Sequence, residues 1–175
     1  MSVCVLVAAA AAVATAATTR DDIEIQQWIN KHAKQAHSVE VPAARYRVVG
    51  ALDGDGRNDV AVLYTLKPRA ANDGESRYLA AFKRQSDNPP GSRPGNARRT
   101  RREGGLRYQA HTLVSGPGAG EANRVTILNR AVVVEMLTFR PGDAACCPTR
   151  ATTRRYRLAE RGLVLVRTDP AKRAR

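Results

Sequence analysis

The sequence predicts an α+β fold in which one N-terminal amphipathic helix packs on a curved antiparallel meander sheet. Apolar residues recur at helical spacing near the N-terminus, and from residue 43 onward they alternate with a period of two. The links between most alternating segments are short, which favours antiparallel neighbours. A chain of 175 residues is about one domain in size, so we expect residues 18–167 to form a single α+β domain.

The segment 19–36, TRDDIEIQQWINKHAKQA, predicts the helix. Thr19 is a suitable N-cap, with Asp22 in the position that completes a capping box. An apolar stripe follows at helical spacing and needs a surface to cover. Its members are Ile25, Trp28, Ile29, His32, Ala33 and Ala36.

Alternating β-prone residues predict eight strands, at 44–52, 59–67, 76–84, 106–114, 123–128, 131–139, 151–158 and 162–167. Each should bury one face and expose the other, as the alternation in Val60, Val62, Tyr64 and Leu66 indicates. Within 106–114, strict alternation places Tyr108 on the buried face. It places His111 on the opposite, exposed face together with Gln109.

Three segments are expected outside the packed domain. Residues 1–17, MSVCVLVAAAAAVATAA, carry no charge and contain an A-x-A pattern, as cleaved signal peptides do. The apolar run is shorter than the ~20 residues of a membrane span, so we expect an exported, periplasmic or secreted protein that does not span the membrane after cleavage. The alternatives are an uncleaved membrane anchor and a cytosolic protein. Residues 85–105 are rich in Arg, Pro and Gly and predict a disordered loop, and residues 168–175 predict a basic tail.

The net charge of +13 favours contact with acidic partners, although an arginine-rich genome would produce the same excess. The arginines concentrate in two segments, 93–107 and 150–157. Candidate polyanion-binding residues are Arg98, Arg99, Arg101, Arg102, Arg154 and Arg155.

The segment 51–62, ALDGDGRNDVAV, has two interpretations. If Gly56 occupies the sixth position of a calcium loop, the oxygen atoms at the ligand positions of that loop converge on one hard cation. Ala51 and Val62 occupy the first and twelfth positions, so the predicted Ca²⁺ binding is weak, in the ~10⁻⁴–10⁻³ M range. The alternative is a Gly/Asp-rich hairpin turn without metal. The calcium ligands would be Asp53, Asp55, Asp59 and the Arg57 carbonyl.

Cys146 and Cys147 are adjacent, and in an oxidising compartment they are candidates for a vicinal disulfide. Adjacent Cα atoms are about 3.8 Å apart, closer than most disulfides prefer. The alternative is two separate thiols. A two-cysteine metal site lacks a supporting histidine pair nearby.

Two motifs together resemble a group of exported bacterial proteins of unknown function: YRVVGALDGDGRNDVAVLYTL at 46–66 and DAACCPT at 143–149, followed by RRYRL at 154–158. Those proteins pair a VxGDLDGDGxxDxAVLYTL segment with a later CCPS segment. The aspartate loop by itself is similar to the calcium loops of FG-GAP repeats and dockerins. The resemblance implies export, one small domain and no established activity.

No serine-nucleophile elbow, zinc helix or phosphate loop occurs in the sequence. Of the histidines, we expect His32 to be packed, His37 to lie near the helix end and His111 to be exposed. We therefore expect a monomeric, exported binding or accessory module of the cell envelope, with an envelope protein or acidic polymer as partner. The alternatives are a basic protein that binds nucleic acid or anionic polymer, and a thiol-redox or hydrolytic enzyme.

Overall fold

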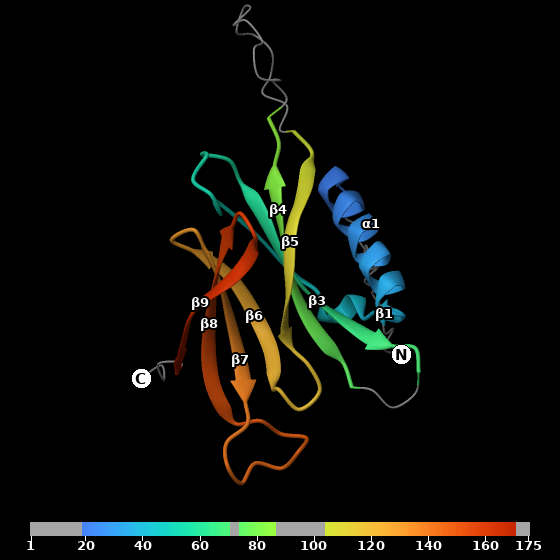
Figure 1. The fold of residues 1–175 in the computed structure, drawn as a ribbon, viewed down its shortest axis with the longest axis vertical. Coiled ribbons are helices and arrows are strands. Elements are labelled where there is room, and N and C mark those ends of the chain that lie inside the picture. The colour runs from blue at the N-terminus through green and yellow to red at the C-terminus, as the bar shows by residue number, and fades with distance from the viewer. Residues whose placement is uncertain (1–18, 71–73, 87–103, 171–175) are drawn as a thin grey trace, which may run out of the picture.

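A computed structural model describes residues 19–70, 74–86 and 104–170 (Figure 1). The predicted signal peptide, most of the predicted disordered loop and the end of the predicted basic tail lie outside these ranges. The helical elements are α1 (Arg20–Gln35) and the 3-10 helix η1 (Pro42–Ala44). The strands are β1 (Ser38–Glu40), β2 (Tyr46–Gly50), β3 (Asp59–Pro68), β4 (Ser76–Arg84), β5 (Leu106–Ser115), β6 (Glu121–Leu128), β7 (Ala131–Thr138), β8 (Arg150–Ala159) and β9 (Gly162–Pro170).

Helix α1 begins with the capping box that the sequence predicts. Asp22 N donates to the Thr19 hydroxyl at 3.3 Å, and Thr19 N donates to the Asp22 carboxylate at 3.1 Å. At the other end, Ala36 N donates to the His32 carbonyl at 2.9 Å. His37 then adopts a positive φ of 49°, which ends the helix and leads the chain into β1.

The strands form two antiparallel sheets, where the sequence predicts one meander. Sheet A has the order β1-β3-β4-β5, with β2 also paired to β3, and sheet B has the order β6-β7-β8-β9. The chain leaves sheet A after β5 through the link 116–120, in which Gly118 and Gly120 have positive φ. Because this turn directs β6 away from the edge of β5, a second sheet begins there. The fold is mixed α+β and rich in sheet.

Sheet A is buried on both faces, with α1 on one side and sheet B on the other (Figure 1). One core joins Ile25 and Ile29 of α1 to Val62 and other residues of sheet A. The second core lies between the sheets and includes Leu63 of β3 and Val134 of β7. This double cover explains why all of β3 from Asp59 to Leu66 is buried, where the alternation predicts one exposed face.

The observed strands overlap all eight predicted segments, and their bounds differ by a few residues. Strand β1, which pairs Val39 with Lys67 on the same edge of β3 as β2, was not predicted because it is too short to show a period. Strand β9 continues to Pro170, into the segment expected as a tail. Within the described ranges, no helix is both long and apolar enough to cross a membrane.

Candidate functional site

Asp59, a predicted calcium ligand, is fully buried at the start of β3 and accepts two backbone hydrogen bonds. Its Oδ2 accepts from Leu52 N at 2.9 Å, and its Oδ1 accepts from Arg84 N at 3.0 Å. Burial raises the pKa of Asp59, and the two amide hydrogen bonds oppose that rise. The side chain therefore ties the aspartate loop to β4.

Asp53 and Asp55 lie at the exposed end of the same loop, where Gly54 and Gly56 have positive φ. Asp53 Oδ1 accepts from Asp55 N at 3.0 Å, and Asp53 also pairs with the Lys83 ammonium. Asp55 Oδ1 accepts from Arg57 N at 2.9 Å, and the Asp55 carboxylate pairs with the Arg57 guanidinium. In the part of the chain that the structure describes, no group of three or more His, Cys, Asp or Glu side chains is placed to hold a metal ion. The weak calcium site stays a prediction.

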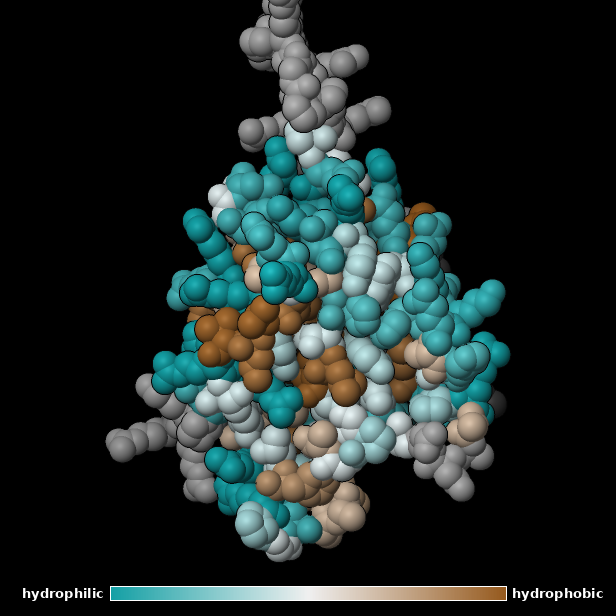
Figure 2. Space-filling model, viewed as in Figure 1, coloured by the Kyte–Doolittle hydropathy of each residue, from teal (hydrophilic) through white to brown (hydrophobic). Residues whose placement is uncertain are grey.

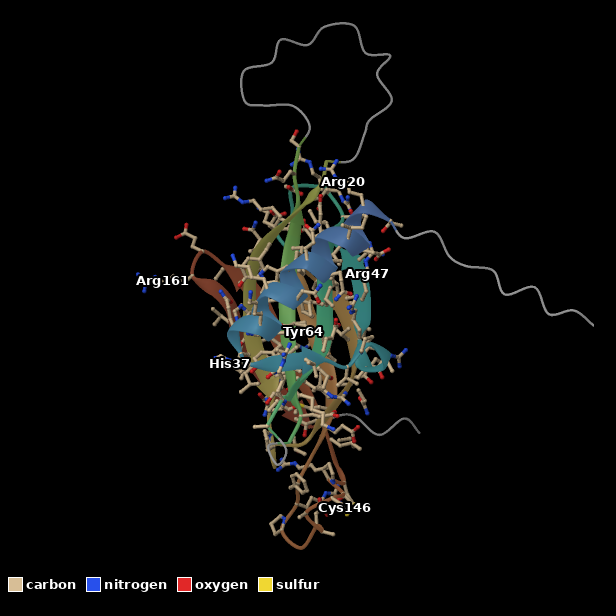
Figure 3. All side chains as sticks on the ribbon, turned by 90° about the vertical axis from the view of Figure 1, so that its right-hand side faces the viewer. Arg20, His37, Arg47, Tyr64, Cys146 and Arg161 are labelled. Carbon is tan, nitrogen blue, oxygen red and sulfur yellow. A yellow bond between two sulfur atoms is a disulfide. The ribbon has the colours of Figure 1, made fainter. Side chains whose placement is uncertain are left out.

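Cys146 and Cys147 are joined by a disulfide in the exposed loop between β7 and β8, with Cα atoms 3.8 Å apart. Figure 3 places Cys146 at the far tip of the molecule. Asp143 closes the loop because it accepts hydrogen bonds from Arg140 N at 2.7 Å and from Thr149 N at 2.9 Å. These bonds lower the pKa of Asp143. Thiol-redox chemistry at this loop stays a prediction.

The two predicted polyanion-binding arginines that the structure describes, Arg154 and Arg155, project from opposite faces of β8. Arg98, Arg99, Arg101 and Arg102 lie outside the described ranges. Arg154 points from β8 toward sheet A, where its Nη1 donates to the Val114 carbonyl at 2.6 Å. Arg155 is its neighbour in the strand and therefore projects from the opposite face of sheet B.

Strand register places four arginines on the outer face of sheet B, which is turned away from sheet A. Because Tyr156 belongs to the core between the sheets, Arg155 and Arg157 on either side of it project outward. Arg167 of β9 lies opposite Arg155. Arg124 of β6 precedes a core residue and projects outward too. We call this surface the basic sheet face and define it by Arg124, Arg155, Arg157 and Arg167.

The basic sheet face carries apolar side chains and two acids beside its arginines. Val164 lies opposite Arg157 and is 49% exposed, so no described element covers this part of the face. Glu135 lies opposite Arg124, and Asp169 pairs with Arg167. Figure 2 shows exposed apolar side chains, in brown, among hydrophilic ones, in teal, over the strands of sheet B.

A cluster of aromatic and imidazole rings that the strand pattern does not predict lies between α1 and sheet A. It depends on a bulge in β5, where the register with β4 shifts at Gln109. A bulge adds one residue to the strand, so Tyr108 and His111 project from the same face. The expectation that His111 lies on the face of Gln109, opposite Tyr108, is wrong for this reason. The only sequence signal is the Tyr-x-x-His spacing. Residues three apart in a strand lie on the same face only if a bulge falls between them, so the spacing indicates the pair only once the bulge is known.

Two histidines of this cluster are each held by a tyrosine hydroxyl. His32 Nδ1 lies 2.7 Å from the hydroxyl oxygen of Tyr64, and His111 Nδ1 lies 2.6 Å from that of Tyr108. The two imidazole ring centres are 4.4 Å apart. Burial lowers the pKa of both histidines, and the charge of His111 lowers that of His32 further. Both shifts favour the neutral form of the imidazoles. We call His32 and His111 the histidine pair.

Trp28, the single tryptophan of the chain, covers the histidine pair. Its ring centre lies 5.4 Å from that of His32 and 5.3 Å from that of His111, and it stacks on Tyr108 at 4.5 Å. Tyr78 meets His32 edge to face at 4.8 Å. In Figure 3, Tyr64 lies on the sheet beneath α1, consistent with its position under these rings.

A solvent-open groove borders His111, one member of the histidine pair. It is lined by Tyr108 and His111 of β5 and by Glu160 and Arg161 of the turn between β8 and β9. Arg161 projects from the side of the molecule at this turn (Figure 3). The groove therefore brings together two segments that lie about fifty residues apart in the chain.

Comparison of the chain with known protein families, curated proteins and solved structures finds no match.

Proposed function

We propose that this protein is an exported binding module of the cell envelope and that the basic sheet face binds an acidic polysaccharide. The observation that carries the proposal is the placement of four arginines in neighbouring rows of one exposed sheet face. Guanidinium groups bind carboxylate and sulfate groups through paired hydrogen bonds, which suits a polymer with regularly spaced anions.

Arg155 supports this proposal because one of its donors has no partner. Its Nε is buried, and no atom of the described residues accepts a hydrogen bond from it. Its neighbours across the sheet are Val133 and Arg167, neither of which offers a side-chain acceptor. Because the Nε atom is buried, a ligand carboxylate would reach it only if the half-buried Arg155 side chain turned outward.

A polysaccharide fits this face better than a nucleic acid does. Proteins that bind single strands stack bases on aromatic side chains, and the described residues of the basic sheet face include no aromatic ring. Tyr156 lies in the same strand, but it is buried between the sheets.

The N-terminal segment 1–17 also favours export, and mass spectrometry of the mature N-terminus in a periplasmic fraction tests that part of the proposal.

The binding proposal is tested with the mature chain, dextran sulfate and uncharged dextran. We expect binding to dextran sulfate alone, with affinity that falls as salt rises because bound counterions are released. Replacing both Arg155 and Arg157 by Ala should reduce the salt slope by about two, about one for each lost contact. The matched control replaces Arg20 and Arg69, two exposed arginines elsewhere on the surface. Equal loss of affinity in both double variants would refute a site on this face.

Weak calcium binding by the aspartate loop is a second proposal. Its candidate ligands are the carboxylates of Asp53 and Asp55, held at the loop tip by glycines at positive φ, and a bound cation would replace their ion pairs with Lys83 and Arg57. Millimolar Ca²⁺ should raise the melting temperature of the protein and should leave that of Asp55→Asn unchanged. An unchanged melting temperature in the wild type would contradict this proposal.

A further inference from the structure

We propose that His32 and His111 form a binding site for a divalent transition-metal ion of the copper class, held through their Nε2 atoms. Each Nδ1 atom is already hydrogen-bonded to a tyrosine hydroxyl, at 2.7 Å for His32 and 2.6 Å for His111. Nε2 is thus the nitrogen that remains for a ligand. Histidines that bind metals characteristically donate their other N–H to a fixed acceptor, which orients the ring and sets the tautomer.

The spacing of the two rings fits one shared ion. A metal–nitrogen bond of about 2.0 Å places each imidazole centre about 3.1 Å from the ion, so adjacent ligands in square-planar geometry have ring centres about 4.4 Å apart. The same bonds in tetrahedral geometry separate the centres by about 5.1 Å. The centres of His32 and His111 are 4.4 Å apart. The ring-centre separation of the histidine pair is therefore that of adjacent positions in the tetragonal geometry that Cu²⁺ prefers, with water in the remaining positions.

The surroundings of the pair favour retention of a bound ion and allow it to enter. Trp28 and Tyr78 pack against His32, and Trp28 and Tyr108 pack against His111, which limits ring rotation. His111 also lines the groove beside the β8–β9 turn, so an ion would approach the pair from the side of His111. Imidazole ligands with nitrogen donors bind Cu²⁺ more tightly than Zn²⁺ or Ni²⁺.

Trp28 provides a direct test because it is the only tryptophan in the chain and lies within 5.4 Å of both imidazole centres. Cu²⁺ is titrated at neutral pH into the mature, tag-free, disulfide-bonded protein while tryptophan fluorescence is recorded. We expect saturable quenching with one equivalent of Cu²⁺, reversed by a chelator. An absence of quenching, or quenching that does not saturate, would overturn the proposal.

Three variants separate this site from other copper ligands. His111→Gln should weaken binding more than about tenfold because one of two nitrogen ligands is lost. Tyr108→Phe keeps both ligands and should weaken binding by about 10–100-fold through loss of the oriented Nδ1–H bond. His37→Gln is the control, because His37 is exposed and follows the end of α1. Circular dichroism verifies that each variant is folded, and equal quenching in His111→Gln and wild type would refute the site.

Discussion

Arg84 on β4 and Asp21 on α1 form an ion pair in which both side chains are largely buried, with Nη2 and Oδ2 2.6 Å apart. The same guanidinium donates through Nε to the Asn58 carbonyl at 3.0 Å and through Nη1 to the Gly104 carbonyl at 3.1 Å. Arg84 thereby joins the first turn of α1 to the start of β3 and the approach to β5. The ion pair thus ties the first turn of α1 to β4.

Arg84→Met should lower the free energy of unfolding by about 1–3 kcal/mol, because it removes the buried partner of Asp21 and leaves the carboxylate, among the described residues, only its ion pair with Arg47. Urea unfolding measures the change. The matched control is Arg20→Ala, which breaks an exposed pair with Glu24 in which the arginine side chain is 74% exposed. That control should cost no more than about 0.5 kcal/mol. Similar values for both variants would show that the buried pair contributes little.

The histidine pair should make the protein less stable in mild acid. The pKa of each histidine is lower in the folded protein than its ordinary value of 6.5, so the unfolded chain binds more protons below that pH. Their contribution is fully present above about pH 6.5 and is lost as the pH falls toward the folded pKa. Melting temperatures measured from about pH 7.5 to 5 in a chelator should therefore decrease.

A histidine variant identifies the groups responsible for that acid sensitivity. His111→Gln should flatten the pH dependence, whereas His37→Gln should leave it as in the wild type. The carboxyl pKa of Asp22 is lowered by its hydrogen bond to Thr19, so its contribution is lost only below its ordinary value of 3.8. The two effects thus fall in separate pH ranges. An unchanged slope in His111→Gln would assign the effect to other groups.

Asp59 should matter for stability irrespective of calcium. Asp59→Asn replaces one acceptor of a backbone amide by a donor, and each hydrogen bond to a charged group contributes about 1.5–3 kcal/mol. We expect a loss of about 3 kcal/mol in chemical unfolding, equal in Ca²⁺ and in chelator. Asp55→Asn, at an exposed position of the same loop, should change stability by less than about 0.5 kcal/mol in chelator. A loss for Asp59→Asn that appears only with Ca²⁺ would instead make Asp59 a ligand.

Gly120 marks the place where the chain passes from sheet A to sheet B. Its φ is 103°, and a Cβ atom there would collide with the Leu137 carbonyl oxygen. Gly118 in the same link also has a positive φ, but a Cβ there meets nothing within 4 Å. Gly118→Ala should cost about 1–2 kcal/mol from φ alone, and Gly120→Ala about 1–3 kcal/mol more from the clash. Thermal melts of the two variants provide the comparison, and equal costs would refute the close approach.

The features that the sequence predicts correctly are those set by patterns among neighbouring residues. The capping box at Thr19 and the stripe from Ile25 to Ala33 lie within one helix, and each strand shows its period within about eight residues. The aspartate loop was also located correctly between two paired strands, because Asp and Gly there suit a turn with or without metal. These features depend on neighbours in the chain, so the sequence contains the information for them.

Pairings between distant segments decided which side chains meet in the folded protein. The bulge at Gln109 depends on the partner strand β4, and it moves His111 to the face of Tyr108 and under α1. Arg154 and Arg155 have different environments because sheet B lies against sheet A: Arg154 faces sheet A, and Arg155 faces outward.

The sequence by itself determined which segments form the helix and eight of the strands, because hydrophobic periodicity and capping act over a few residues. The tertiary structure alone decided that the strands divide into two sheets, that β3 is covered on both faces, and that His32 meets His111. The physical reason is that burial, strand register and ring contacts arise between residues far apart in the chain, and no local period encodes which segments meet.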